Sequence, residues 1–201
     1  MLSLRKKSPS FDGHFTFKPH TMHSTNLAEL IPLLEERIGV TPGFFERLDT
    51  DDDTDWAFVI KLHALIEAAI SHLLAMELRR NELEKVFSRL DISNKHTGKA
   101  AFVEALELLD KPARTFMHSL STLRNSLVHD VKNVDFDLEK YVSEMSDQKK
   151  KQFVLDFNLL STEVTNDIRK LFLVDPRQAL WYSGMAFLGL VYLKIRPSIS
   201  H

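Results

Sequence analysis

The chain has 201 residues, and 26 lysines and arginines against 28 aspartates and glutamates give a net charge of −2. This balance excludes the overall positive field of an avid nucleic-acid binder, so an RNA partner would need a local basic patch. The absence of cysteine excludes disulfides and cysteine-ligated zinc. With only 6 glycines, and apolar residues recurring at three- and four-residue spacing, the sequence predicts an all-α protein.

Three parts are expected along the chain. Residues 1–22 are predicted to form an irregular N-terminal arm, residues 23–174 a helical bundle, and residues 175–201 a hydrophobic C-terminal helix. The basic residues near the start are not followed by an apolar run, so a secretory signal is not expected. We therefore expect a cytoplasmic location. The first helix of the bundle is predicted over about residues 24–38.

An acidic run at 49–55 precedes the strongest predicted helix. Its alternating aspartates begin like a calcium loop, but Thr54 stands where the glycine is needed and Ile60 where the glutamate is needed. Stabilisation of the next helix N-terminus is the better interpretation. That helix is predicted from Trp56 to about Arg80 and is apolar on most faces, as expected for the centre of a bundle.

His63 and Glu67 interrupt this apolar helix on one shared face, four residues apart. As a metal pair they lack a third ligand, so no metal and no cofactor is expected. Glu67 is predicted to be either a buried structural acceptor or part of the wall of a cleft.

Two shorter helices follow, predicted at 82–90 and 99–109, with a polar connector at 91–98 between them. Lys95 and Lys99 cluster at this connector. They are either part of a solvated loop or a rim that contacts RNA phosphates. Lys132, in the break after the next helix, completes this candidate RNA-binding set.

Pro112 fits the first turn of the following helix, whose apolar face is Phe116, Leu120, Leu123 and Leu127. The same helix carries Arg124, with Asn125 directly after it, and His129 five positions on. Arginine binds phosphate through a planar fork of donors, and histidine exchanges protons near neutral pH. Five residues on an ideal helix separate these two side chains by about 140°. Such a separation fits a site completed across a two-fold axis, and it equally fits two unrelated surface groups.

The C-terminal third is predicted to be helical as well. A short helix is expected at 138–145, and a long helix at 147–174 with a heptad-like apolar stripe. Residues 178–193 carry no charge. They are predicted to form either a buried or dimer-covering helix, or an anchor that contacts the inner face of a membrane.

The spacing of Arg124 and His129 resembles the R-x-x-x-x-H signature of the HEPN superfamily, whose members are small helical domains. Residues 56–70 are similar to the first core helix of the branch that includes the mannitol operon repressor, and 87–109 and 116–129 continue the likeness. The resemblance covers about residues 55–135 and extends toward 173. It implies an all-α, HEPN-like helical bundle.

The resemblance also implies a function, namely that of a dimeric, metal-independent endoribonuclease, a toxin or antiviral defence effector. His129 would act as general base and acid, Arg124 would stabilise the phosphorane, and Asn125 and Glu67 would assist. The alternative is a non-catalytic regulatory or scaffold protein similar to the mannitol operon repressor. RNA, a second copy of the chain, and an antitoxin or regulatory protein are the expected partners. Val131 stands where some toxin members have a modifiable tyrosine, which argues against that type of antitoxin control.

Overall fold

The structure is a computed structural model that describes residues 31–32, 35–36, 40–48, 54–94, 96–129 and 131–195. All regular structure in these ranges is helical, which confirms the predicted all-α class. The predicted N-terminal arm lies outside the described residues, as does most of the helix expected over 24–38. Within that helix, residues 31–32 and 35–36 are helical.

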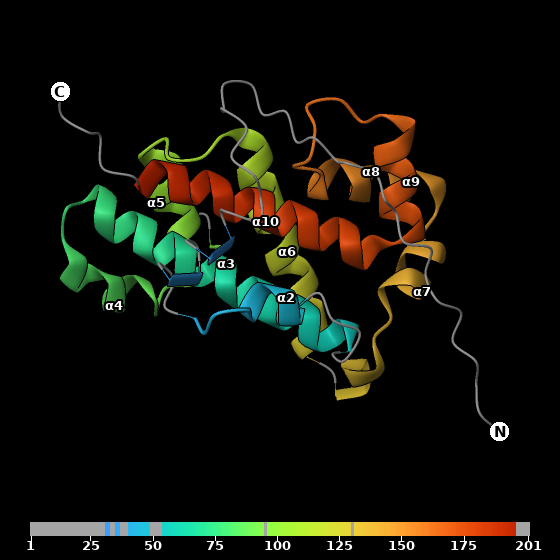
Figure 1. Cartoon of the computed structure of the whole chain (residues 1–201), viewed down its shortest axis with the longest axis horizontal. Helices are drawn as coiled ribbons and strands as arrows, with labels where there is room; N and C mark the ends of the chain where they lie inside the picture. The colour runs from blue at the N-terminus through green and yellow to red at the C-terminus, as the bar shows by residue number, and fades with distance from the viewer. Residues whose placement is uncertain are drawn as a thin grey trace.

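Two long helices, α3 (Asp55–Glu77) and α10 (Pro176–Ile195), lie side by side through the middle of the molecule (Figure 1) and form its most extensive helix–helix contact. Helix α3 begins at Thr54, whose side chain accepts a hydrogen bond from the Ala57 amide, as N-cap residues do. Helix α6 (Lys111–Val128) also packs against α3. The interior of the bundle is therefore built on α3.

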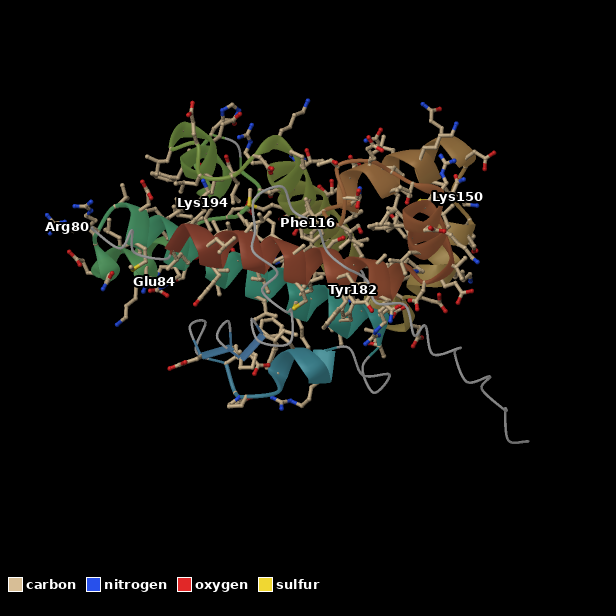
Figure 2. All side chains as sticks on the ribbon, turned by 45° about the horizontal axis from the view of Figure 1, so that its top comes forward. Arg80, Glu84, Phe116, Lys150, Tyr182 and Lys194 are labelled. Carbon is tan, nitrogen blue, oxygen red and sulfur yellow. The ribbon has the colours of Figure 1, made fainter. Side chains whose placement is uncertain are left out.

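The two ends of the bundle carry the shorter helices (Figure 1). One end holds η1 (Asn81–Leu83), α4 (Glu84–Phe87) and α5 (Lys99–Ala105). The other holds η2 (Val131–Asp135), α7 (Leu138–Ser143), α8 (Asp147–Phe157) and α9 (Asn166–Val174). Figure 2 shows Arg80 and Lys150 at these opposite ends, and Phe116 between them in the interior. There the ring of Phe116 lies 5.6 Å from Phe187 of α10 and 6.0 Å from Phe157 of α8.

A short helix, α2 (Phe44–Leu48), covers part of α3. Glu35 fixes its start, because the buried carboxylate accepts hydrogen bonds from the amides of Gly43 and Phe45. The indole of Trp181 donates to the carbonyl of Phe45, at 3.4 Å, and so connects α2 to α10.

The predicted long helix over 147–174 is wrong, because the structure breaks it into α8 and α9. Asn158 ends α8 with an extended backbone, donates to the Ser161 carbonyl and accepts from the Leu160 amide. Thr165 then caps α9. Short polar side chains that bond to nearby backbone compete with helical hydrogen bonds. The apolar stripe is consequently interrupted, and Val164 is 39% exposed.

The chain also turns sharply after α3, where Arg79 has a φ of 53°. The helix predicted over 82–90 is therefore the separate pair η1 and α4, and it is shorter than expected. Helix α5 ends before a second left-handed residue, Glu107, with a φ of 52°. Left-handed backbone at a non-glycine residue ends a helix efficiently, because it turns the chain out of the helical path.

Most side chains of α10 are buried against the rest of the bundle. This burial matches the buried-helix interpretation of residues 178–193 more closely than that of an anchor. Among the described helices, α3 is the one long and apolar enough to cross a bilayer, but 61% of its apolar window is buried inside the protein. A core helix of a bundle has the same composition, so α3 assigns no membrane location.

The close contact between α3 and α10 depends on Gly184. A methyl group on it would lie 2.6 Å from Leu62 Cδ1. Overpacking costs about 1–3 kcal/mol, and replacing glycine with alanine within a helix contributes about 1 kcal/mol in the other direction. We expect Gly184→Ala to lower the free energy of unfolding by about 1 kcal/mol, measured by urea denaturation.

Leu62→Ala provides the matched background for this substitution. Alone it removes a fully buried side chain and is expected to cost about 2–5 kcal/mol. In that background Gly184→Ala has room for its methyl group and should no longer destabilise. An equal loss in both backgrounds would contradict the steric explanation.

Candidate functional site

Helix α6 carries the R-x-x-x-x-H residues. Asp110 caps its N-terminus by accepting from the Ala113 amide, and Pro112 lies in its first turn, as predicted. Phe116, Leu120, Leu123 and Leu127 are buried, also as predicted. Because this apolar face points inward, Arg124 and Asn125 lie half-buried at its edge and His129 is exposed.

Contacts from two other elements hold the C-terminal end of α6. Asn133, in η2, donates from Nδ2 to the Ser126 carbonyl at 2.9 Å. The indole nitrogen of Trp56, in α3, donates to the Leu127 carbonyl at 3.3 Å. The last carbonyls of a helix lack partners within the helix, so these donors stabilise its end. His129 is the C-cap residue of α6 and directly follows this stabilised helix end.

Arg124 donates from Nη1 to Oδ1 of Asn125 at 3.0 Å. In the described ranges it forms no ion pair with a carboxylate. A guanidinium has five donor hydrogens in a planar fork. Arg124 is therefore a half-buried positive charge with donors to spare for an anion. No hydrogen bond connects Arg124 to His129 in the part of the chain that the structure describes, so a composite site remains a prediction.

Glu67, in α3, accepts a hydrogen bond at Oε1 from Lys99 Nζ at 2.7 Å. Its other oxygen, Oε2, lies 4.0 Å from Nδ1 of His63. The side chain of Glu67 is 31% exposed. The sequence predicted a buried structural acceptor or part of a cleft wall. The structure shows a partly exposed carboxylate that accepts a hydrogen bond from Lys99 and forms an ion pair with it.

The sequence predicted that Lys99 lies in a solvated loop or on a rim that contacts RNA phosphates. Both predictions are wrong for Lys99. Its side chain is completely buried, and Nζ also donates to the Leu90 carbonyl at 2.8 Å. Buried lysines are rare unless paired, and here Glu67 is the partner. The backbone of Lys132 lies in η2, but its side chain, like all of Lys95, lies outside the described residues.

The connector before α5 turns Lys99 inward. Asp91 Oδ1 accepts from the amides of Ser93 and Asn94, and Asn94 Oδ1 accepts from the amides of His96 and Thr97. Partial burial acts to raise the pKa of Asp91, but the hydrogen bonds from the Ser93 hydroxyl and from the amides of Ser93 and Asn94 outweigh it and lower the pKa. Gly98 is required because a Cβ there would lie 2.2 Å from the Asp91 carbonyl oxygen. The tight loop brings the Lys99 amide onto that carbonyl, at 2.9 Å.

His63, in α3, contacts α6 through Ser121. It is buried, and Nε2 lies 3.1 Å from Ser121 Oγ of α6. Burial lowers its pKa from the ordinary value of 6.5, opposed by the negative charge of Glu67 and reinforced by Arg124 and Lys99. His63 is therefore neutral at pH 7, within electrostatic range of Arg124.

Ser121, His63 and Glu67 have the order of a nucleophile, a base and an acid, but they do not form a nucleophilic triad. Ser121 is 1% exposed, and its hydroxyl donates to the Met117 carbonyl at 2.9 Å. A serine nucleophile must reach a substrate and direct its proton to the histidine. The three residues are a structural network between α3 and α6.

Sequence reasoning identified His63 and Glu67 as neighbours on one face, but not Ser121 or Lys99 as their partners. The signal for the first pair was the i, i+4 spacing on an apolar helix. Ser121 and Lys99 carried no local signal, because tertiary packing of α6 and α5 onto α3 creates their contacts. In the described ranges no group of three histidine or acidic side chains could hold a metal ion.

No family model, no curated protein and no solved structure matches this sequence.

Proposed function

We propose that this protein is a metal-independent endoribonuclease of the HEPN type, acting as a cytoplasmic homodimer. The observation that carries the proposal is Arg124, half-buried on α6 with donors not committed to a carboxylate in the described ranges, on the same helix as the exposed His129. A guanidinium binds phosphate and an imidazole transfers protons near neutral pH. RNA cleavage through the 2′-hydroxyl requires these two capacities.

In the proposed reaction, His129 removes the proton of the 2′-hydroxyl, and the 2′-oxygen attacks the adjacent phosphorus. Arg124 stabilises the negative charge that develops on the phosphorane oxygens. The bond to the 5′-oxygen then breaks, and an imidazolium returns a proton to that leaving group. The products are a 2′,3′-cyclic phosphate and a 5′-hydroxyl. The proton taken from the 2′-hydroxyl balances the proton given to the 5′-oxygen, so the reaction needs no water as a reactant.

The proposed site requires a second copy of the chain, because Arg124 and His129 do not converge within one helix. The 140° separation on an ideal helix fits a cleft formed by two α6 helices related by a two-fold axis. In this arrangement Asn125 orients Arg124, consistent with their hydrogen bond. Glu67 contributes a carboxylate near the same charges, since it and Arg124 both act electrostatically on His63.

The test is incubation of purified protein with a labelled mixed RNA pool in EDTA, alongside Arg124→Ala. Removing one donor to a transition-state oxyanion typically costs about 10²–10³-fold in rate. We expect wild type to cleave and Arg124→Ala to lose activity by about that factor. Arg114, also half-buried on α6, provides the matched control, and Arg114→Ala should retain cleavage.

Absence of cleavage by wild-type protein would contradict the proposal and favour the regulatory or scaffold alternative similar to the mannitol operon repressor. In that case Arg124 would serve an interface, and Arg124→Ala would change the oligomeric state measured by sedimentation. If the protein cleaves RNA, we propose that it acts as a toxin or an antiviral defence effector. An antitoxin or regulatory protein would then control its activity.

A further inference from the structure

The tautomer of His63 follows from the hydrogen bonds of Ser121. The hydroxyl of Ser121 has one proton, and the Met117 carbonyl, which can only accept, takes it at 2.9 Å. Ser121 Oγ must therefore accept from His63, whose Nε2 lies 3.1 Å away. Hydrogen bonding thus assigns the proton of the neutral imidazole to Nε2, which leaves a lone pair at Nδ1.

That lone pair faces the carboxylate of Glu67. Nδ1 of His63 lies 4.0 Å from Oε2, while Lys99 Nζ holds Oε1 at 2.7 Å. Two lone pairs facing each other do not attract, so at neutral pH Oε2 is not bonded to His63. A proton added at Nδ1 would make it a donor aimed at Oε2.

The three side chains differ in their access to solvent. Those of His63 and Lys99 are 7% and 0% exposed, whereas that of Glu67 is 31% exposed. Only Glu67 can therefore touch a ligand. The two buried bases can act on a ligand only through the position and charge of this carboxylate.

We propose that His63 and Lys99 are positioning residues for Glu67: Lys99 holds one carboxylate oxygen, and a proton at Nδ1 of His63 decides whether the other oxygen is available. The proposal rests on the proposed function where it places Glu67 in the ribonuclease site. When His63 is neutral, Oε2 is free to accept from a ribose hydroxyl or from a protonated His129. When His63 is protonated, it draws Oε2 inward and adds positive charge beside Lys99.

Charges from several elements set the protonation of His63. Besides burial, Arg124 of α6 and Lys99 of α5 lower its pKa, whereas Glu67 of α3 and Asp91 of the connector raise it. The pKa lies below the ordinary value of 6.5, so the neutral form prevails at pH 7. Oε2 is then available at neutral pH and becomes engaged as the pH falls through the pKa of His63.

The test measures the imidazole itself, by nitrogen-detected NMR titration of the full-length protein. In wild type we expect Nε2 protonated and Nδ1 unprotonated at pH 7.5, with a pKa below 6.5. Lys99→Met and Arg124→Gln should each raise this pKa, because each removes a charge that lowers it.

If the neutral imidazole of His63 in the wild-type protein carries its proton on Nδ1, the proposal is overturned. The wild-type measurement alone is sufficient for this outcome. An unchanged His63 titration in a folded Lys99→Met protein would also overturn the proposal. The cleavage assay supplies the second readout: the acid side of the pH–rate profile should shift to higher pH in Lys99→Met. Cleavage with an unshifted profile refutes the positioning role. If no RNA is cleaved, the ribonuclease proposal fails, and the NMR result alone decides whether His63 controls Glu67.

Discussion

His129→Ala is expected to lower the rate of RNA cleavage by about 10²–10⁴-fold, the usual contribution of a general acid–base residue. The protein should stay folded, because His129 is exposed at the end of α6 and contributes nothing to the apolar core. The measurement is the initial cleavage rate in EDTA at matched protein concentration, with circular dichroism to verify the helical content.

His118 gives this experiment its control, since it is also an exposed histidine on α6, about three turns toward the N-terminus. His118→Ala removes the same chemical group from the same helix and should leave the cleavage rate unchanged. Equal losses in the two variants would point to a general effect on α6. Full cleavage activity of His129→Ala would exclude His129 as the general base and acid of the reaction.

Glu67→Leu is expected to lower the free energy of unfolding by about 3–5 kcal/mol, the usual cost of leaving one member of a buried ion pair without its partner. Lys99 would keep only the Leu90 carbonyl for an ammonium that has no exposed surface. Removing the other partner, by Lys99→Met, should lower the free energy of unfolding by a smaller amount. In Lys99→Met a side chain of similar shape fills the space, and the partly exposed carboxylate of Glu67 can be hydrated. We expect about 1–2 kcal/mol for it, mainly from the unpaired Leu90 carbonyl.

Urea denaturation of the two single variants and of the double variant tests this asymmetry. The double variant no longer contains the buried ammonium of Lys99, so its stability should be close to that of Lys99→Met alone. Glu82→Gln is the control, because its ion pair with Arg80 is about two-thirds exposed on both sides and should contribute little. Additive costs in the double variant would mean that the 2.7 Å contact is not the source of the stability.

Sequence patterns predicted those parts of the fold that depend on local chemistry. Pro112 marked the start of α6, the predicted helix start at 99 is that of α5, and the predicted boundary between 174 and 175 separates α9 from α10. The break between α8 and α9 was missed, because the apolar spacing continues across it. Bonds from Asn158 and caps such as Thr165 decide the break, and their effect depends on where the two helices pack.

The candidate site was predictable only in part, for a similar reason. Arg124 and His129 could be recognised from the sequence by their chemistry. In the structure Arg124 is half-buried on α6, and His129 is exposed at the end of that helix. Lys99 looked like a surface lysine in a polar loop, yet the loop turns its side chain into the bundle. No local pattern shows that a charge will be buried, because its partner Glu67 lies 32 residues away. The same holds for His63 and Ser121, which are 58 residues apart.

The measurement that tests the central claim most directly is the chemistry of the RNA ends. Wild-type protein is incubated in EDTA with a defined RNA of natural 2′-hydroxyls, and with the same RNA carrying 2′-methoxy groups. The account predicts fragments that end in 2′,3′-cyclic phosphate and begin with 5′-hydroxyl, and no cleavage of the methylated RNA. Fragments with 5′-phosphate ends, or cleavage of the methylated RNA, would contradict it, because the 2′-oxygen would then not be the nucleophile.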